Sequence, residues 1–164
     1  MRTWRLRCSQ WLPHPPAAVF PFFADAHNLE LLTPKFLRFE VLTPKPIAMH
    51  EGTLIDYRIR VHGFPMRWRT RIARWDPPNV FVDEQLRGPY VVWHHTHTFV
   101  AENGGTRLGD EVVMRPRGGP LAPLVMSFFV KKDVERIFRF RADAMAQQFG
   151  GGPPQCAIEW DPAA

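Results

Sequence analysis

The chain is poor in cysteine and lysine, and it has no long hydrophobic run. Its 164 residues include two cysteines, Cys8 and Cys156, too few for a disulfide-rich scaffold or a thiolate metal site. No apolar stretch reaches the roughly 18 residues that a membrane-spanning helix needs, so we expect no membrane insertion. The basic N-terminal segment lacks the apolar region of a secretory signal, which predicts a cytoplasmic protein.

Several catalytic motifs are also missing. The sequence contains no Gly-x-Ser-x-Gly nucleophile motif and no phosphate-binding loop. The glycine pairs Gly104-Gly105 and Gly118-Gly119 sit at expected turns and do not match a dinucleotide-binding fingerprint. Both cysteines lie outside the polar residues discussed below, which argues against a thiol nucleophile.

What the sequence does contain is enough apolar area for one folded domain. Hydrophobic residues make up 45% of the chain, with 13 Phe and 6 Trp, which excludes intrinsic disorder for most of it. The run Gly150-Gly151-Gly152-Pro153-Pro154 should end the folded part. We therefore predict a domain over residues 1–149 and a tail over residues 150–164.

Alternating patterns and turn residues predict the elements and their order. The expected strands are Thr3–Trp11, Phe36–Thr43, Thr53–His62, Phe64–Trp75, Val80–Leu86, Val91–Val100 and Thr106–Met114. Two short helices, Ala17–Ala24 and His27–Leu32, follow the first strand, and a long helix runs from Pro120 to about Phe149. This order predicts an α+β fold in which a seven-stranded, curved antiparallel sheet wraps around the long C-terminal helix.

Turn positions suggest strand registers, and the registers decide which side chains face the helix. Pairing His62 with Pro65 would place Tyr57 opposite Thr70, and the turn after Asp76 would place Ile72 opposite Asp83. Pairing Ala101 with Thr106 would place His97 opposite Asp110. The residues expected around a cavity are Tyr57, Trp68, Thr70, Asp83, Gln85, Trp93, His95, His97, Phe99 and Asp110 on the sheet, and Phe128 on the helix. The irregular link at residues 87–90 leaves open whether Asp83 lies beside His95.

Carboxylates and imidazoles on a buried face are costly unless they are hydrogen-bonded or paired. Three explanations stay open: a structural network, a polar group that orients a mostly apolar ligand, or a catalytic or metal-binding set. His95 and His97 form a His-x-His pair to which Asp110 could add a carboxylate ligand, and His97 with Asp110 could also act as a general base. Because His-x-His on a strand is common by chance, we predict no metal and no other cofactor.

The formal charge of +5 comes from arginine, since only four of the 21 basic residues are lysines. Arg58, Arg60, Arg67 and Arg69 should share the outer face of the sheet and could contact an anionic macromolecule. Trp68 points to the opposite face, however, and acidic partners are available nearby. We therefore expect a solvated, partly paired face and no nucleic-acid partner.

Four segments resemble one protein superfamily: LPHPPAAVFPFFADAHNLELLTP, GTLIDYRIRVHGFPMRWRTRI, FVDEQLRGPYVVWHHTHTF and FFVKKDVERIFRFR. They are similar to the START-like, helix-grip superfamily (SRPBCC), which includes polyketide cyclases and lipid carriers, and most similar to a bacterial ligand-binding subgroup. The resemblance implies a helix-grip fold with a hydrophobic cavity and no universal catalytic residue. It also suggests a short-chain dehydrogenase or epimerase-like protein as a partner, because such proteins are fused to or encoded beside members of the subgroup.

Two functions follow as hypotheses. The first is a carrier or sensor that binds a small, largely apolar molecule, such as a lipid, isoprenoid or polyketide-like compound, in the internal cavity. The second is a cyclase, dehydratase or isomerase that uses His97 as acid/base and Asp110 to hold its tautomer in the same cavity. The polar patch of Asp83, His95, His97 and Asp110 would orient the ligand in either case.

Overall fold

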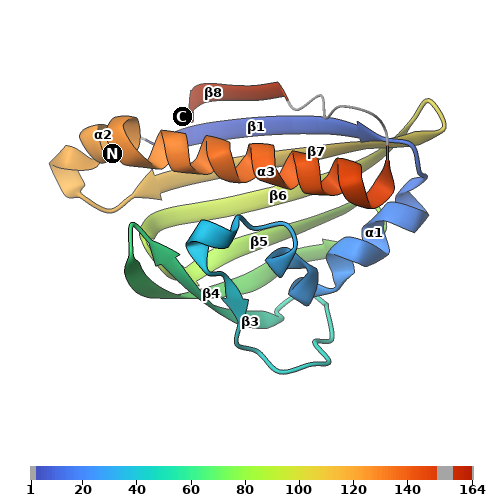
Figure 1. The fold of residues 1–164 in the computed structure, drawn as a ribbon, viewed down its shortest axis with the longest axis horizontal. Coiled ribbons are helices and arrows are strands. Elements are labelled where there is room, and N and C mark those ends of the chain that lie inside the picture. The colour runs from blue at the N-terminus through green and yellow to red at the C-terminus, as the bar shows by residue number, and fades with distance from the viewer. Residues whose placement is uncertain (1–2, 151–156, 164) are drawn as a thin grey trace.

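The computed structural model describes residues 3–150 and 157–163, which form one antiparallel sheet and a set of helices against it (Figure 1). Eight strands lie in the order β2-β3-β4-β5-β6-β7-β1-β8. Their bounds are β1 Thr3–Leu12, β2 Glu40–Val41, β3 Leu54–Val61, β4 Phe64–Asp76, β5 Val80–Arg87, β6 Tyr90–Glu102, β7 Gly105–Pro116 and β8 Ala157–Ala163. The expected α+β class and curved antiparallel sheet are confirmed.

The helices occupy two stretches of the chain. After β1 come α1 (Pro16–Ala24) and two 3₁₀ turns, η1 (Ala26–Glu30) and η2 (Lys35–Leu37); after β7 come η3 (Gly119–Leu121), α2 (Ala122–Val125), a π-helical turn η4 (Met126–Val130) and α3 (Lys131–Phe149). In Figure 1, α3 runs along the sheet and α1 lies near one end of it. None of the helices in the described ranges is both long and apolar enough to cross a bilayer.

The eighth strand is the difference from the expected count of seven. Within the predicted tail, Ala157–Ala163 forms β8, which pairs antiparallel with the free edge of β1. The Trp160 indole donates a 2.7 Å hydrogen bond to Glu135 of α3, which connects this strand to the helix layer. The remaining tail positions, residues 151–156 and 164, lie outside the described residues.

The strand expected over Phe36–Thr43 was mostly wrong. Only Glu40–Val41 pairs with β3, because the preceding residues turn into η2. Arg38 ends that turn with φ 44°, a left-handed conformation that breaks an extended chain. Because β2 has only two residues, most of this edge of the sheet, beside β3, is flanked by irregular chain.

The β3–β4 hairpin is tighter than expected. His62 and Gly63 both have positive φ, 49° and 85°, and form a two-residue turn that pairs Val61 with Phe64. Tyr57 therefore lies opposite Trp68 rather than Thr70. The shift is two residues, so every side chain stays on its expected face.

The other predicted registers agree with the structure. Ile72 pairs with Asp83 and His97 pairs with Asp110, as the turn positions suggested. At the turn Asp76 pairs with Val80, which would displace the register by one residue, and a bulge between Ile72 and Arg74 restores the pairing of Ile72 with Asp83. The polar residues on the concave face are thus aligned by backbone pairing.

The long helix is interrupted, and this changes which residues it buries. The π-helical turn η4 inserts an extra residue into the helical repeat, so side chains before it and after it do not share one stripe. Met126, Val134, Phe138 and Met145 are buried, whereas Phe128 is 67% exposed. Leu121 and Leu124 are exposed as well, and the expected place of Phe128 in the cavity lining was wrong.

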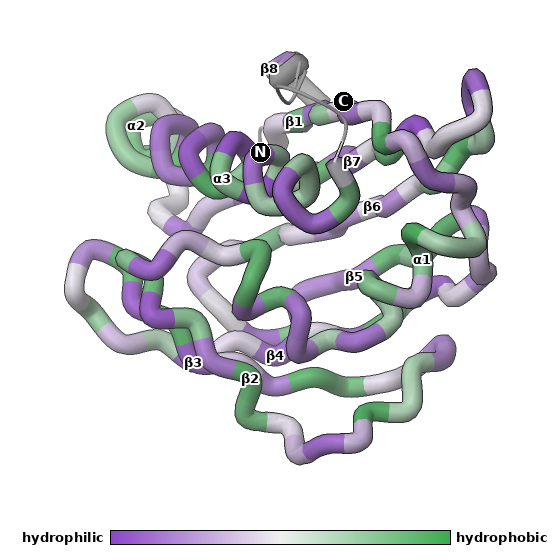
Figure 2. The backbone as a smooth tube through the Cα atoms, turned by 45° about the vertical axis from the view of Figure 1, so that its right-hand side comes forward, coloured by the Kyte–Doolittle hydropathy of each residue, from purple (hydrophilic) through white to green (hydrophobic). Residues whose placement is uncertain are grey.

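The core is divided into clusters rather than spread evenly along the sheet. An aromatic cluster beneath α1 brings Phe20 and Phe23 onto Phe99, with ring centroids 5.1 and 5.0 Å apart. A second cluster packs Leu6, Val112 and Phe138 between β1, β7 and α3. In Figure 2, α3 alternates between hydrophilic and hydrophobic residues, as expected of a helix with one buried face. Between these clusters lies the site described next.

Candidate functional site

A cavity of about 580 Å³ lies between the concave face of the sheet and the helices. Its walls are mainly apolar and include Ile55 and Ile59 of β3, Trp68 of β4, and Val134 and Phe138 of α3. Strand alternation turns these β3 and β4 residues inward, and the i, i+4 spacing of Val134 and Phe138 places both on one helix face. The arrangement forms a hydrophobic chamber under the helix.

Most of the residues predicted from the sequence line this cavity. They are Tyr57, Trp68, Thr70, Asp83, Trp93, His95 and His97. Three predicted residues are buried or half-buried behind the wall instead: Gln85, Phe99 and Asp110. Phe128 faces outward for the reason given above.

The residues behind the wall have structural contacts that explain their positions. The Gln85 side-chain amide exchanges hydrogen bonds with the backbone of Tyr90, at 2.9 and 3.3 Å, and so stabilises the β5–β6 turn. Phe99 belongs to the aromatic cluster beneath α1. Asp110 lies behind the two histidines and contacts both of them.

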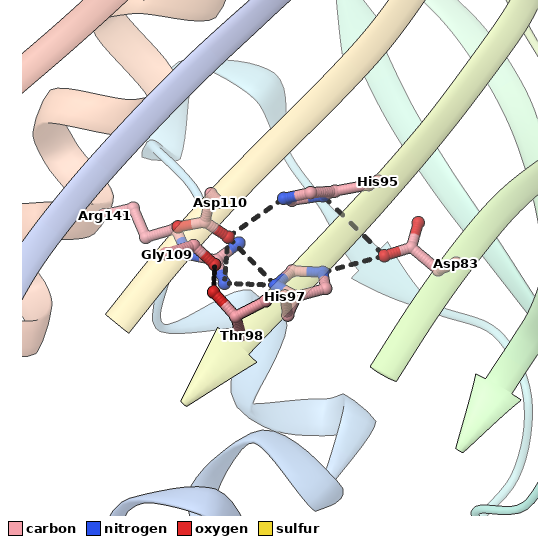
Figure 3. A network of polar contacts seen from close by, with 7 residues as sticks. All are labelled: Asp83, His95, His97, Thr98, Gly109, Asp110 and Arg141. Carbon is pink, nitrogen blue, oxygen red and sulfur yellow. Dashed lines mark hydrogen bonds and ion pairs between the residues drawn. The ribbon is translucent and has the colours of Figure 1, made fainter. Parts of the chain in front are cut away.

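The polar residues of the concave face form one connected cluster (Figure 3). Asp110 Oδ1 lies 2.9 Å from His95 Nε2 and 2.9 Å from His97 Nδ1. On the other side of the rings, Asp83 Oδ2 lies 2.9 Å from His97 Nε2 and 3.7 Å from His95 Nδ1. The backbone pairing of Asp83 with His95 answers the question that the sequence left open.

Arg141 of α3 completes the cluster, and sequence analysis missed it. Its guanidinium lies 3.3 Å from Asp110 Oδ1 and 3.1 Å from His97 Nδ1, and the residue is only 7% exposed. One signal was present: residue 141 falls in the same i, i+3, i+4 stripe as the buried Phe138, Ala142 and Met145. An arginine in an apolar stripe is the exception that needs a buried partner.

The surroundings of the cluster are dry and aromatic. The Phe81 ring stacks on His97 at a centroid distance of 4.0 Å, and Phe138 lies edge-on to His95 at 5.6 Å. His95 and His97 are 6% and 3% exposed. Electrostatic interactions are strong in such an environment because little water screens them.

Burial and charge shift the pKa values in this cluster. Burial, together with the neighbouring His97, lowers the pKa of His95 to about 4 despite its hydrogen bond to Asp110. Burial by itself would raise the pKa of Asp110, but the Arg141 guanidinium and the two histidine hydrogen bonds hold it well below its usual range. In the same way, the hydrogen bond from His97 and the charges nearby outweigh burial and lower the pKa of Asp83.

Asp83 is the member of the cluster most open to the cavity. Its side chain is 18% exposed, compared with 6% for Asp110, and Figure 3 shows its second carboxylate oxygen pointing away from both histidines. Asp83, His95 and His97 also place three potential metal-ligand atoms within 4.8 Å of one another. The set considered from the sequence contained Asp110 instead of Asp83.

Two exposed aromatic residues belong to the cavity lining, so they mark the part of the cavity nearest to solvent. Phe64 at the start of β4 and Phe129 in η4 are 71% and 55% exposed, and both contribute to the lining. His62 of the β3–β4 turn and Asp133 of α3 approach to 2.8 Å across the opening. This contact links the hairpin to the helix next to the π-helical turn.

The outer face of the sheet differs from the cavity face. Its arginines are exposed, and several are paired: Arg69 with Asp56 and Arg71 with Glu84, each at 2.8 Å, and Arg58 with Glu40. These pairs fit the expected solvated, partly paired face. Trp68 contacts Tyr90 and Trp93 on the inner side, away from these arginines.

The fold is that of a helix-grip protein, in which a long helix closes a cavity on a curved sheet. A family model described as "Polyketide cyclase / dehydrase and lipid transport" matches residues 12–140. The chain therefore belongs to this family, which confirms the resemblance to the SRPBCC superfamily. No curated protein matches the sequence.

Solved structures share the fold at low sequence identity. The Zhui aromatase/cyclase from Streptomyces sp. R1128 has a TM-score of 0.70 and 17% identity, covering 89% of this chain and 93% of its own. Protein CV1439 from Chromobacterium violaceum has a TM-score of 0.68 and 16% identity, with 90% and 97% covered. A nucleoside-diphosphate sugar epimerase from Corynebacterium glutamicum has a TM-score of 0.57 and 20% identity, and the match covers 86% of this chain but 28% of that one.

Proposed function

We propose that the protein binds one small, largely apolar molecule in its cavity, such as a lipid, isoprenoid or polyketide-like compound, and acts as a carrier or sensor. The observation that carries the proposal is an apolar chamber of about 580 Å³ with charged residues at one place in its wall. Small-molecule sites are typically chambers of about 300–1,000 Å³ with mostly apolar walls and a few polar groups that fix orientation. Apolar burial would contribute about 25 cal/mol per Å² to affinity.

The polar cluster defines how such a molecule would be oriented. The free side of the Asp83 carboxylate can accept a hydrogen bond from a hydroxyl or amide group of the ligand. Arg141 Nε is a buried donor without a hydrogen-bond partner among the described residues. A molecule with an apolar body and one polar end would match this distribution.

The direct test is native mass spectrometry of protein purified without organic extraction. We expect a bound species that organic solvent removes, and a rise in melting temperature when matching compounds from a lipid, isoprenoid and polyketide panel are added back. An empty protein in the spectrum, together with no thermal shift across the panel, would reject the proposal.

Two variants on the same strand separate cavity binding from binding elsewhere. Ile59→Trp adds volume at a buried cavity-lining position of β3, whereas Leu54→Trp adds the same side chain on the exposed outer side. We expect Ile59→Trp to weaken ligand binding by roughly 5- to 150-fold, since 1–3 kcal/mol is the usual cost of overfilling a packed site. Leu54→Trp should bind like the wild type. Equal binding by both variants would place the ligand outside the cavity.

An enzyme of the cyclase, dehydratase or isomerase kind is the second candidate. It is favoured by His97, whose two ring nitrogens each lie 2.9 Å from a carboxylate oxygen, one of Asp110 and one of Asp83. Asp110 would hold the ring while Asp83, at the cavity surface, would exchange the proton with substrate. Under this proposal His97→Gln abolishes turnover of a panel substrate while binding persists, and unchanged turnover rejects it.

The location and partner proposed from the sequence remain predictions. Under this proposal a cytoplasmic carrier would deliver its ligand to a short-chain dehydrogenase or epimerase-like protein. Co-purification of such a protein with the tagged chain would test the partner. Its absence from the purified complex would argue against it.

A further inference from the structure

We infer that Asp83, His95 and His97 form a binding site for one divalent transition-metal ion, such as Zn²⁺ or Fe²⁺, in the wall of the cavity. The ligand atoms are Asp83 Oδ2, His95 Nδ1 and His97 Nε2, which lie within 4.8 Å of one another. The site goes beyond the proposed function because it takes a metal ion rather than an organic molecule. It also differs from the set considered from the sequence, in which Asp110 was the carboxylate.

The spacing of the three atoms is close to that of a metal site. Metal bonds to imidazole nitrogen and carboxylate oxygen are about 2.0–2.2 Å long, so adjacent ligand atoms lie roughly 3–3.6 Å apart. Asp83 Oδ2 lies 2.9 Å from His97 Nε2 and 3.7 Å from His95 Nδ1. Shifts of a few tenths of an ångström would bring these two distances into the required range, and the two imidazole nitrogens, which lie within 4.8 Å of each other, would approach by at most about 1.2 Å.

Asp110 supplies the second argument, because it orients both rings. Its Oδ1 is hydrogen-bonded to His95 Nε2 at 2.9 Å and lies 2.9 Å from His97 Nδ1, so one carboxylate is placed to accept a proton from each imidazole. When the ring protons are on the nitrogens beside Asp110, His95 Nε2 and His97 Nδ1, the other two ring nitrogens carry lone pairs. These nitrogens, His95 Nδ1 and His97 Nε2, both face Asp83 (Figure 3). Metal-binding histidines are characteristically held by this kind of carboxylate hydrogen bond.

The contact between His97 and Asp83 then requires a positive charge. A nitrogen lone pair and a carboxylate oxygen repel each other at 2.9 Å unless a proton or a metal ion lies between them. A proton on His97 Nε2 would remove the repulsion at that nitrogen only. A metal ion would bind His95 Nδ1 as well, because this nitrogen also faces Asp83 Oδ2. In the alternative tautomer, Arg141 donates a hydrogen bond to His97 Nδ1 at 3.1 Å, and the proton on His97 Nε2 points to Asp83. This tautomer leaves no free lone pair on His97 for a metal ion.

The composition of the set decides the class of ion. Two imidazoles and one carboxylate suit zinc and ferrous iron better than the harder Mg²⁺ or Ca²⁺, which prefer oxygen ligands. Three protein ligands leave coordination positions open, and Asp83 lies at the cavity surface. An oxygen atom of a cavity ligand could therefore complete the coordination.

Metal titration of tag-free protein tests the inference without any organic ligand. After chelator treatment and dialysis, Zn²⁺ is titrated by calorimetry and Co²⁺ is followed by visible absorption. We expect one tightly bound ion per chain and Co²⁺ bands of the intensity typical of four- or five-coordinate ions. No stoichiometric binding, or the weak spectrum of hydrated Co²⁺, would overturn the site and favour the proton. The result would not affect the proposed binding of an apolar molecule, because mass spectrometry measures that separately.

Variants then identify the ligands. Asp83→Asn and His97→Gln should lose Zn²⁺ affinity at least as strongly as Asp110→Asn, for which removal of an orienting carboxylate predicts a loss of about 10–100-fold. His94→Gln is the matched control, since that ring lies on the same strand but contacts Glu84 on the outer face. If Asp83→Asn and His97→Gln bind like His94→Gln, the ion is held elsewhere and the inference fails. Should a variant not fold, the wild-type Co²⁺ spectrum still decides.

Discussion

The two faces of the sheet both carry pairs of opposite charge, but in different surroundings. On the cavity face, Asp110 and Arg141 lie 3.3 Å apart with side chains 6% and 9% exposed. On the outer face, Arg71 and Glu84 lie 2.8 Å apart with side chains 48% and 30% exposed. The shorter pair is the weaker one, because water solvates and screens it. Burial, more than distance, decides how strongly the fold depends on a charge.

The largest expected effect comes from breaking the buried pair. Asp110→Ala leaves the Arg141 guanidinium uncompensated in a dry site and removes the acceptor of two histidine hydrogen bonds. We expect the free energy of unfolding to fall by about 3–5 kcal/mol. Urea denaturation monitored by circular dichroism measures this. A loss below about 1 kcal/mol, the range of exposed pairs, would mean that the cluster is solvated in solution.

The second largest effect should be a loss of folding stability in acid, caused by the same buried cluster. In chelator-treated protein the pKa of His95 is about 4 when folded, compared with 6.5 for an ordinary histidine. Below pH 6.5 the unfolded chain therefore binds a proton that the folded chain refuses, so stability falls as the pH drops from about 6.5 to 4. The lowered pKa of Asp110 acts in the same direction at still lower pH.

The control for this pH dependence is His95→Gln, which removes the buried imidazole. Unfolding midpoints in urea between pH 7 and pH 4 should fall less steeply for this variant than for the wild type. Parallel curves for the two proteins would show that another group causes the acid lability.

The smallest effect should follow from breaking the outer pair. Arg71→Ala is expected to change the free energy of unfolding by less than about 1 kcal/mol, and the change should shrink further at high salt. The same denaturation experiment at low and high ionic strength measures it. A cost comparable to that of Asp110→Ala would contradict the distinction between the two faces.

The comparison of the two faces also shows how much of the site could be predicted from the sequence. The turn residues at Asp76 and Asn103 fixed the registers that place His97 opposite Asp110, and the alternation of β6 placed both histidines inward. Strand pairing is a local rule, so it could be applied without coordinates. Most of the sheet residues that line the cavity were therefore predictable.

What could not be predicted depends on contacts between distant elements. The other arginines of the helix, Arg136 and Arg139, are exposed, and only the packing of Arg141 against the sheet shows that it is buried. The outward position of Phe128 results from the π-helical turn, which periodicity alone does not reveal. Asp83 could not be placed beside His95 because the link between β5 and β6 is irregular, and the two strands pair only from Val80–Thr98 to Glu84–His94.

A crystal structure of the protein purified from cells, without organic extraction, tests the account most directly. We expect electron density for a single elongated molecule beneath α3, with a polar atom within hydrogen-bond distance of Asp83. Side chains that close the space between α3 and the sheet, or an Asp83 carboxylate turned out into solvent, would contradict the account.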